Sequence, residues 1–225
     1  MSKLPWLVGG GVVAYLWWRG EQSPRSPSSS TPPPPAPAWL PGAWVWPVPS
    51  WNGRTPVISD GFYSKRAGHP RHGGVDIMFR RQPGDAFAAG TPNGSKLFVM
   101  PDNLPALAAY DGDVWSAIKT PQGYAVVIDH RPIKVSTFYT HLDKLFVSPP
   151  SRGEKQRVRA GQPIGIIGFS PLDPERLKHL HFELRLGGPD DRVDPALAMR
   201  TWKVLPDPNS LVARNAHDYA RSRYV

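Results

Sequence analysis

Two histidines one residue apart open the polar side of KHLHFELRL, residues 178–186. Apolar and polar residues alternate strictly here, which predicts a β-strand with one face buried. His179 and His181 then point to the same side, with Cβ atoms roughly 7 Å apart at a rise of about 3.3 Å per residue. At that spacing one imidazole can bind a metal while its neighbour acts on a substrate atom beside it. A pair of ordinary surface histidines would show the same spacing.

A second group of candidate ligands lies upstream in RHGGVDIMF, residues 71–79. His72 and Asp76 share a face if this segment is extended, and the two glycines between them permit close approach of the backbone. With His181 they supply three ligands of the types that zinc prefers, the usual number in a catalytic site that keeps a fourth position for water. Turn chemistry alone, with a histidine in a loop and an aspartate before a strand, also explains the spacing.

Cysteine chemistry is excluded because the chain has no cysteine, so any metal must be held by histidine and carboxylate. A third histidine segment, FYTHLDKL at 138–145, places His141 at the end of a predicted strand, where a lone histidine is usually structural. No H-E-x-x-H helix motif is present, which excludes the helical zinc-protease arrangement.

Short β-type runs separated by Gly, Pro, Asp and Asn must position these residues. The clearest are VWSAI (114–118), YAVVIDH (124–130), VSTFYTHL (135–142), PIGIIGF (163–169) and LHFELRL (180–186). No convincing amphipathic helix lies between them, and the hydrophobic content of 40% is ample for a core. The pattern predicts an all-β, antiparallel, sandwich-like or barrel-like domain.

The first 20 residues predict a membrane anchor. Residues 4–18, LPWLVGGGVVAYLWW, are uncharged and lie between Lys3 and Arg19. As a helix they would be roughly 22 Å long, short of a hydrocarbon core of about 30 Å, but flanking basic residues can reach the interface. A cleaved signal is the competing interpretation, although Trp17 and Trp18 stand where small residues would precede a cleavage site. A buried or virion-embedded segment is a third.

Residues 21–41 are rich in Pro and Ser and predict a semi-rigid linker, which would reach about 60 Å at roughly 3.1 Å per residue. The net charge of +9 is spread along the chain without a block of Lys or Arg, so we expect no nucleic-acid-binding arm. Such spread charge suits contact with an anionic polymer or surface, and equally suits simple solubility.

In their order along the chain, RHGGVDI, FYTHL and HLHFELR resemble the lysostaphin-type zinc metallopeptidases of family M23, which cut peptide bridges or stems in peptidoglycan. WPVPS, VISDGFYSKR, LPALAAYDGDV, GYAVVIDH and VRAGQPIGIIG extend the resemblance over about residues 44–200. The resemblance implies a compact antiparallel β-sandwich-like peptidase domain with one Zn²⁺ per chain in a groove. His72, Asp76 and His181 would be the metal ligands, and His141 and His179 the catalytic histidines.

This resemblance places an M23-type domain at 42–205 and a tail at 206–225, for which a helix capped by Asp207 or Asn209 is one interpretation. The chain departs from the family pattern in an insertion at about 80–103 and in the loop GFSPLDPERLK at 168–178. Both are expected to border the groove. Glu183 can orient a histidine or pair with Arg185 in solvent.

The implied function is cleavage of peptidoglycan peptides by a domain held outside the cytoplasm by the membrane anchor, or carried on a virion as an entry lysin. The intact set of five residues favours an enzyme. The alternative is a wall-binding or activator module, or a structural virion protein, that keeps the fold without turnover.

The anchor can be tested by fractionation. The full-length chain should sediment with membranes and resist extraction by salt, because the apolar run is held by burial rather than by charge. A chain shortened to begin at Trp39 should remain in the supernatant. A mature N-terminus found beyond residue 20 would instead indicate a cleaved signal.

Overall fold

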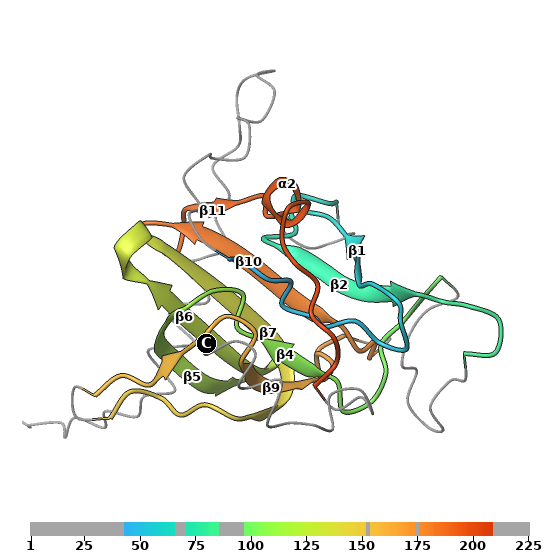
Figure 1. The fold of residues 1–225 in the computed structure, drawn as a ribbon, viewed down its shortest axis with the longest axis horizontal. Coiled ribbons are helices and arrows are strands. Elements are labelled where there is room, and N and C mark those ends of the chain that lie inside the picture. Colours follow the sequence, from blue (N-terminus) through green and yellow to red (C-terminus); the bar gives the residue numbers. More distant parts are fainter. Residues whose placement is uncertain (1–42, 66–70, 86–96, 152–153, 174–175, 209–225) are drawn as a thin grey trace, which may run out of the picture.

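The computed structural model describes residues 43–65, 71–85, 97–151, 154–173 and 176–208 (Figure 1). These residues are almost entirely β, with one 3-10 turn, η1 (Arg131–Ile133), and one short helix, α2 (Ala196–Met199). The strands are β1 (Val57–Asp60), β2 (Val75–Arg80), β3 (Phe98–Val99), β4 (Pro105–Leu107), β5 (Gly112–Thr120), β6 (Gly123–His130), β7 (Val135–Leu145), β8 (Arg157–Val158), β9 (Pro163–Ile167), β10 (Leu180–Leu186) and β11 (Arg192–Val193).

The strands of the described chain pair antiparallel in one connected sheet, in the order β1-β2-β10-β7-β6-β5-β8. β3 pairs with β2, β11 pairs with β10, and β9 pairs with the end of β7 and carries β4. The all-β antiparallel prediction is therefore confirmed, and the five predicted runs correspond to β5, β6, β7, β9 and β10. β10 lies between β2 and β7, so the three strands that carry the candidate residues are neighbours.

The prediction that β10 buries one face only is wrong, because both faces are buried. Its apolar side chains belong to the main core. On the opposite side, Glu183 is 4% exposed and Arg185 is 1% exposed. Their burial is tolerated because Glu183 forms ion pairs with both Arg185 and Arg192. The alternation of the sequence therefore marks a strand with an apolar face and a buried polar face.

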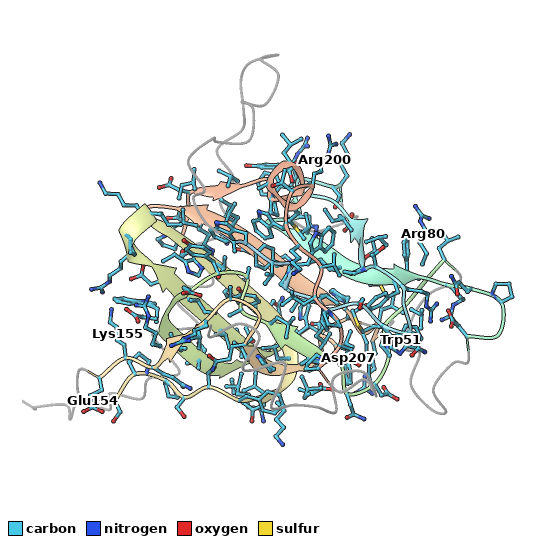
Figure 2. All side chains as sticks on the ribbon, viewed as in Figure 1. Trp51, Arg80, Glu154, Lys155, Arg200 and Asp207 are labelled. Atoms are coloured by element: carbon cyan, nitrogen blue, oxygen red, sulfur yellow. The ribbon has the colours of Figure 1, made fainter. Side chains whose placement is uncertain are left out.

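The two ends of the described chain are tied together. Trp44 stacks on Tyr110 and on Trp202, with ring centroids 4.7 and 4.8 Å apart. Isolated parallel bridges join Val45 to Lys203 and Ser50 to Pro206. Trp51 and Asp207, the next residues along each segment, lie on the same side of the molecule in Figure 2. The segment after the linker thus closes the domain against its C-terminal part.

The proposed anchor (1–20) and linker (21–41) and most of the tail (206–225) lie outside the described residues. In the described part of the chain, no helix has the length and apolar character needed to cross a membrane. The domain boundaries stay predictions.

A buried chain of hydrogen bonds crosses the core face of β6 and β7. His130 Nδ1 lies 2.8 Å from the Asp111 carbonyl oxygen and must donate to it, while His130 Nε2 lies 3.0 Å from Thr137 Oγ1. Thr137 Oγ1 is 3.0 Å from the Tyr139 hydroxyl, to which the Ala109 N–H donates at 2.8 Å. A neutral His130 satisfies every group in this chain. Burial accordingly lowers the pKa of His130 below its usual 6.5, against opposing effects of Asp111 and Asp129.

This lowered pKa predicts that acid destabilises the fold. The unfolded chain takes up a proton on His130 below pH 6.5, whereas the folded chain takes it up only at its lower pKa. Between those values the free energy of unfolding should fall as the pH falls, by up to about 1.4 kcal/mol per pH unit. We expect His130→Asn, which keeps a donor for Asp111 but cannot titrate, to flatten the dependence of Tm on pH between 7 and 5. Equal slopes in the two proteins would exclude His130 as the cause.

Candidate metal centre and catalytic histidines

The structure brings all five predicted site residues together. His181 on β10 faces Asp76 on β2 as its direct cross-strand partner. His72 lies just before β2 and is held by backbone hydrogen bonds to Tyr63 and Ser64. His179 immediately precedes β10, and His141 lies within β7.

Three ligand atoms form a compact triangle. His72 Nε2 lies 2.8 Å from His181 Nδ1. Asp76 Oδ1 lies 3.0 Å from each of these nitrogens. The three residues are a group that could hold a metal ion, and all are almost fully buried.

Each imidazole has one nitrogen inside the triangle and one outside it. The hydrogen bond of the outside nitrogen determines whether the inside nitrogen carries a hydrogen or a lone pair. His72 Nδ1 lies 2.9 Å from the carbonyl oxygen of Gly61, so this nitrogen carries the hydrogen. His181 Nε2 lies 3.1 Å from Glu183 Oε1 and donates to that carboxylate. When both rings are neutral, the inner nitrogens therefore present lone pairs. Two lone pairs and a carboxylate oxygen at 2.8–3.0 Å from one another require a cation or a proton between them.

The pKa values of Asp76 and His181 agree with this requirement for positive charge. Burial would raise the pKa of Asp76, but His179 and hydrogen bonds from His181 and His72 outweigh burial and hold the pKa well below its usual value. Burial would lower the pKa of His181, yet Asp76 and Glu183 raise it to about 9. Near neutral pH a proton on His181 can therefore supply this positive charge. A divalent cation would take that proton's place.

The two other histidines are oriented by backbone carbonyl groups. His179 Nδ1 donates to Leu177 O at 2.8 Å, which leaves its Nε2 3.7 Å from Asp76 Oδ1. His141 Nδ1 donates to Gln122 O at 3.0 Å. The ring centroid of His141 lies 4.6 Å from that of His179 and 5.9 Å from that of His181. Burial, together with the charges of His179 and His181, lowers the pKa of His141 well below its usual value.

A β-bulge places His141 in this group. The register of β7 on β6 shifts between the Tyr124–Leu142 and Val126–Tyr139 pairs, and His141 has φ of 66°. In a regular strand, His141 would point to the same side as Tyr139, which is fully buried in the core. A bulge re-aims a side chain, at the cost of a left-handed backbone conformation in a residue other than glycine. The prediction that His141 ends its strand is wrong, since β7 continues to Leu145.

Some functional groups were not identifiable from the sequence. Both alternatives for Glu183 occur together, because its carboxylate contacts His181 and Arg185, and the pair with Arg185 is buried rather than in solvent. No pattern in the sequence indicated a role for Arg192, because it reaches Glu183 only through the pairing of β11 with β10. The glycine pair before Asp76 was a visible signal: a Cβ on Gly74 would lie only 3.0 Å from His181 Nε2.

A family model confirms the resemblance read from the motifs. The model of peptidase family M23 matches residues 92–195, which include His141, His179 and His181. Through this region the chain is similar to peptidase family M23. The other two candidate ligands, His72 and Asp76, precede the matched region and are joined to it by the pairing of β2 with β10. No curated protein matched the sequence.

Solved structures similar to this chain include a zinc-containing peptidase from Vibrio cholerae, with 26% identity and a TM-score of 0.49 over 72% of this chain and 41% of that one. The catalytic domain of lysostaphin from Staphylococcus simulans has 21% identity and a TM-score of 0.47, with 67% and 95% covered. A chain of the SpoIIIAH–SpoIIQ complex has 21% identity and a TM-score of 0.51, with 69% and 99% covered, and supports the fold. This chain thus spans 41% of the length of the Vibrio cholerae protein.

The approach of β2 to β10 generates a mutational prediction. A Cβ on Gly74 would overlap the Phe182 carbonyl oxygen and lie 2.8 Å from Glu183 Cγ, so the two strands would have to separate. Gly74→Ala should lower the free energy of unfolding by about 1–3 kcal/mol, the usual range for overpacking. Gly61→Ala is the matched control, since no atom lies within 4 Å of its added Cβ. Denaturant titration compares the two, and equal stabilities would show that the strands do not need this glycine.

Proposed function

We propose that this chain is a zinc-dependent endopeptidase that cleaves peptide bonds in bacterial peptidoglycan. The observation that carries the proposal is the triangle of His72 Nε2, Asp76 Oδ1 and His181 Nδ1, whose two imidazoles have both outer N–H groups committed to oxygen acceptors. The match to the family M23 model supports a peptidase, and the resemblance to lysostaphin-type sequences supports peptidoglycan as its substrate.

The donor set fits one zinc ion per chain. Two neutral imidazole nitrogens and one carboxylate oxygen are ligands that zinc takes in catalytic sites, where three protein ligands leave a fourth position open. When bound there, zinc would lower the pKa of a coordinated water to about 7 and polarise the carbonyl group of a peptide.

The two remaining histidines act on protons. His179 is the candidate general base, because its Nδ1 is fixed by Leu177 and its Nε2 lies 3.7 Å from the ligand atom of Asp76. His141, fixed by Gln122, is the candidate group for stabilising the developing oxyanion or for protonating the leaving amine. The geometry is equally compatible with the reverse assignment. Both rings are positioned by carbonyl groups, so each has one defined nitrogen available to the reaction.

The proposed setting follows from the N-terminal segments. An anchor at 4–18 and a linker at 21–41 would hold the domain outside the cytoplasm at the wall, and a virion location would serve the same reaction during entry. The spread net charge of +9 would favour contact with an anionic wall, and no nucleic acid is proposed as a partner. Mass spectrometry of the peptides released from purified walls identifies the bond that is cut.

Single alanine variants separate ligands from catalysts. His181→Ala should lose zinc and activity together, because it removes one corner of the triangle. His179→Ala and His141→Ala should keep zinc and lose turnover by roughly 10²–10⁴-fold, the usual range for an acid–base group. Zinc content and release of wall peptides are measured on the same preparations.

The double variant His141→Ala/His179→Ala should lose less than the product of the single effects if both residues serve one step. Full zinc in the His181 variant would contradict the ligand assignment. A folded, zinc-loaded wild type that binds walls without cleaving them would identify a binding or activator module instead of an enzyme.

A further inference from the structure

Of the four histidines in the site, His181 differs from the others in the partner of its outer nitrogen. His72, His141 and His179 each donate to a backbone carbonyl oxygen, and the partly exposed carboxylate of Asp60 lies farther from His72 Nδ1, at 3.5 Å. His181 Nε2 faces Oε1 of Glu183 at 3.1 Å, so a full negative charge stands behind this ring. A carboxylate in this position makes an imidazole a stronger metal ligand and fixes its orientation.

The carboxylate of Glu183 is itself held by two arginines. Oε1 serves His181, while Oε2 accepts from Arg185 Nε at 2.7 Å and from Arg192 Nε at 3.0 Å. The Arg185 guanidinium is fully buried and lies over the Phe138 ring, 4.5 Å from its centroid. With one oxygen directed to the histidine and the other to the arginines, the carboxylate cannot rotate without breaking buried ion pairs.

The backbone is arranged around this group. Arg185 and Arg192 are cross-strand partners in the pairing of β10 with β11, which brings both guanidinium groups to the same carboxylate. A Cβ on Gly73 would lie 3.3 Å from Arg192 Nε, and a Cβ on Gly74 would lie 2.8 Å from Glu183 Cγ. The two glycines between His72 and Asp76 therefore leave the space that Arg192 and Glu183 occupy.

We propose that Glu183, held by Arg185 and Arg192, is a positioning residue that fixes His181 with Nδ1 toward Asp76 and His72 and strengthens its bond to the metal. The proposal rests on the proposed zinc site and extends it by three residues. It differs from a purely structural ion-pair cluster in one respect: loss of the cluster should change metal binding in protein that is still folded.

The test is zinc affinity, measured by competition with a chelator on the full-length chain at fixed pH. Glu183→Gln keeps the size of the side chain but removes the charge behind His181, and should weaken zinc binding about 10–100-fold. Arg192→Gln, which removes the half-buried arginine, should weaken it in the same direction, and Arg192→Lys should restore part of the loss. Asp129→Asn is the matched control, because Asp129 pairs with the exposed Arg131 and not with a residue of the site.

A spectroscopic readout accompanies the affinities. Substitution of Co²⁺ for zinc should give visible absorption bands that differ between wild type and Glu183→Gln, since these bands report the geometry of the ligands, while Asp129→Asn should match wild type. Unfolding transitions of each variant show whether it is folded. If Glu183→Gln does not fold, the zinc affinities of Arg192→Gln and Arg192→Lys test the positioning role.

Wild-type zinc affinity and cobalt bands in folded Glu183→Gln or Arg192→Gln would overturn the inference while leaving the proposed function intact. If the wild-type chain takes up no zinc, the proposed function and this inference fall together. Weaker binding in both variants, with an unchanged Asp129→Asn control, supports a positioning role.

Discussion

The register of β10 between β2 and β7 is the constraint on which the site depends. It sets His181 opposite Asp76 on one side and opposite Thr140 on the other. A slip of one residue would turn His181 into the core and bring leucine to the metal site. Burial of three apolar side chains on the other face opposes that slip: Leu180, Phe182 and Leu184. Each contributes about 1.5–3 kcal/mol when fully buried, so packing of the core face aligns the ligands on the opposite face.

The buried polar face of β10 is stable because its charges are arranged in complementary pairs. Asp76 and Glu183 are anions, and the buried Arg185, the half-buried Arg192 and the protonated form of His181 balance their charge. Burial would raise the pKa of Glu183, but Arg185, His181 and Arg192 lower it to about 2, so this carboxylate stays ionised. The result is a permanent negative charge beside a histidine that must release a proton before it can bind a metal.

Strands with a local alternating pattern could be predicted from the sequence. Contacts that depend on how strands far apart in the sequence pair could not. Alternation in 180–186 predicted β10, and the resemblance of three motifs implied the five site residues that the fold brings together. The inward direction of His141 was not predictable, because it requires a bulge against β6 that no spacing in FYTHL records. Burial of Arg185 was missed for a related reason: alternation shows which residues share a face, but not what covers that face.

The predicted insertion at about 80–103 is held at both ends by strand pairing. Its two ends continue β2 and form β3, pairing Phe79 with Val99 and Arg80 with Phe98. Arg80 lies at the outer end of β2 in Figure 2. Close by, Arg54 donates two hydrogen bonds of 2.7 and 2.9 Å to the carboxylate of Asp85. Added chain length beyond such a closed ladder costs little, since loop-closure entropy grows only with the logarithm of length. Pairing with β3 as well as with β10 thus holds β2, and with it the ligand triangle, in register.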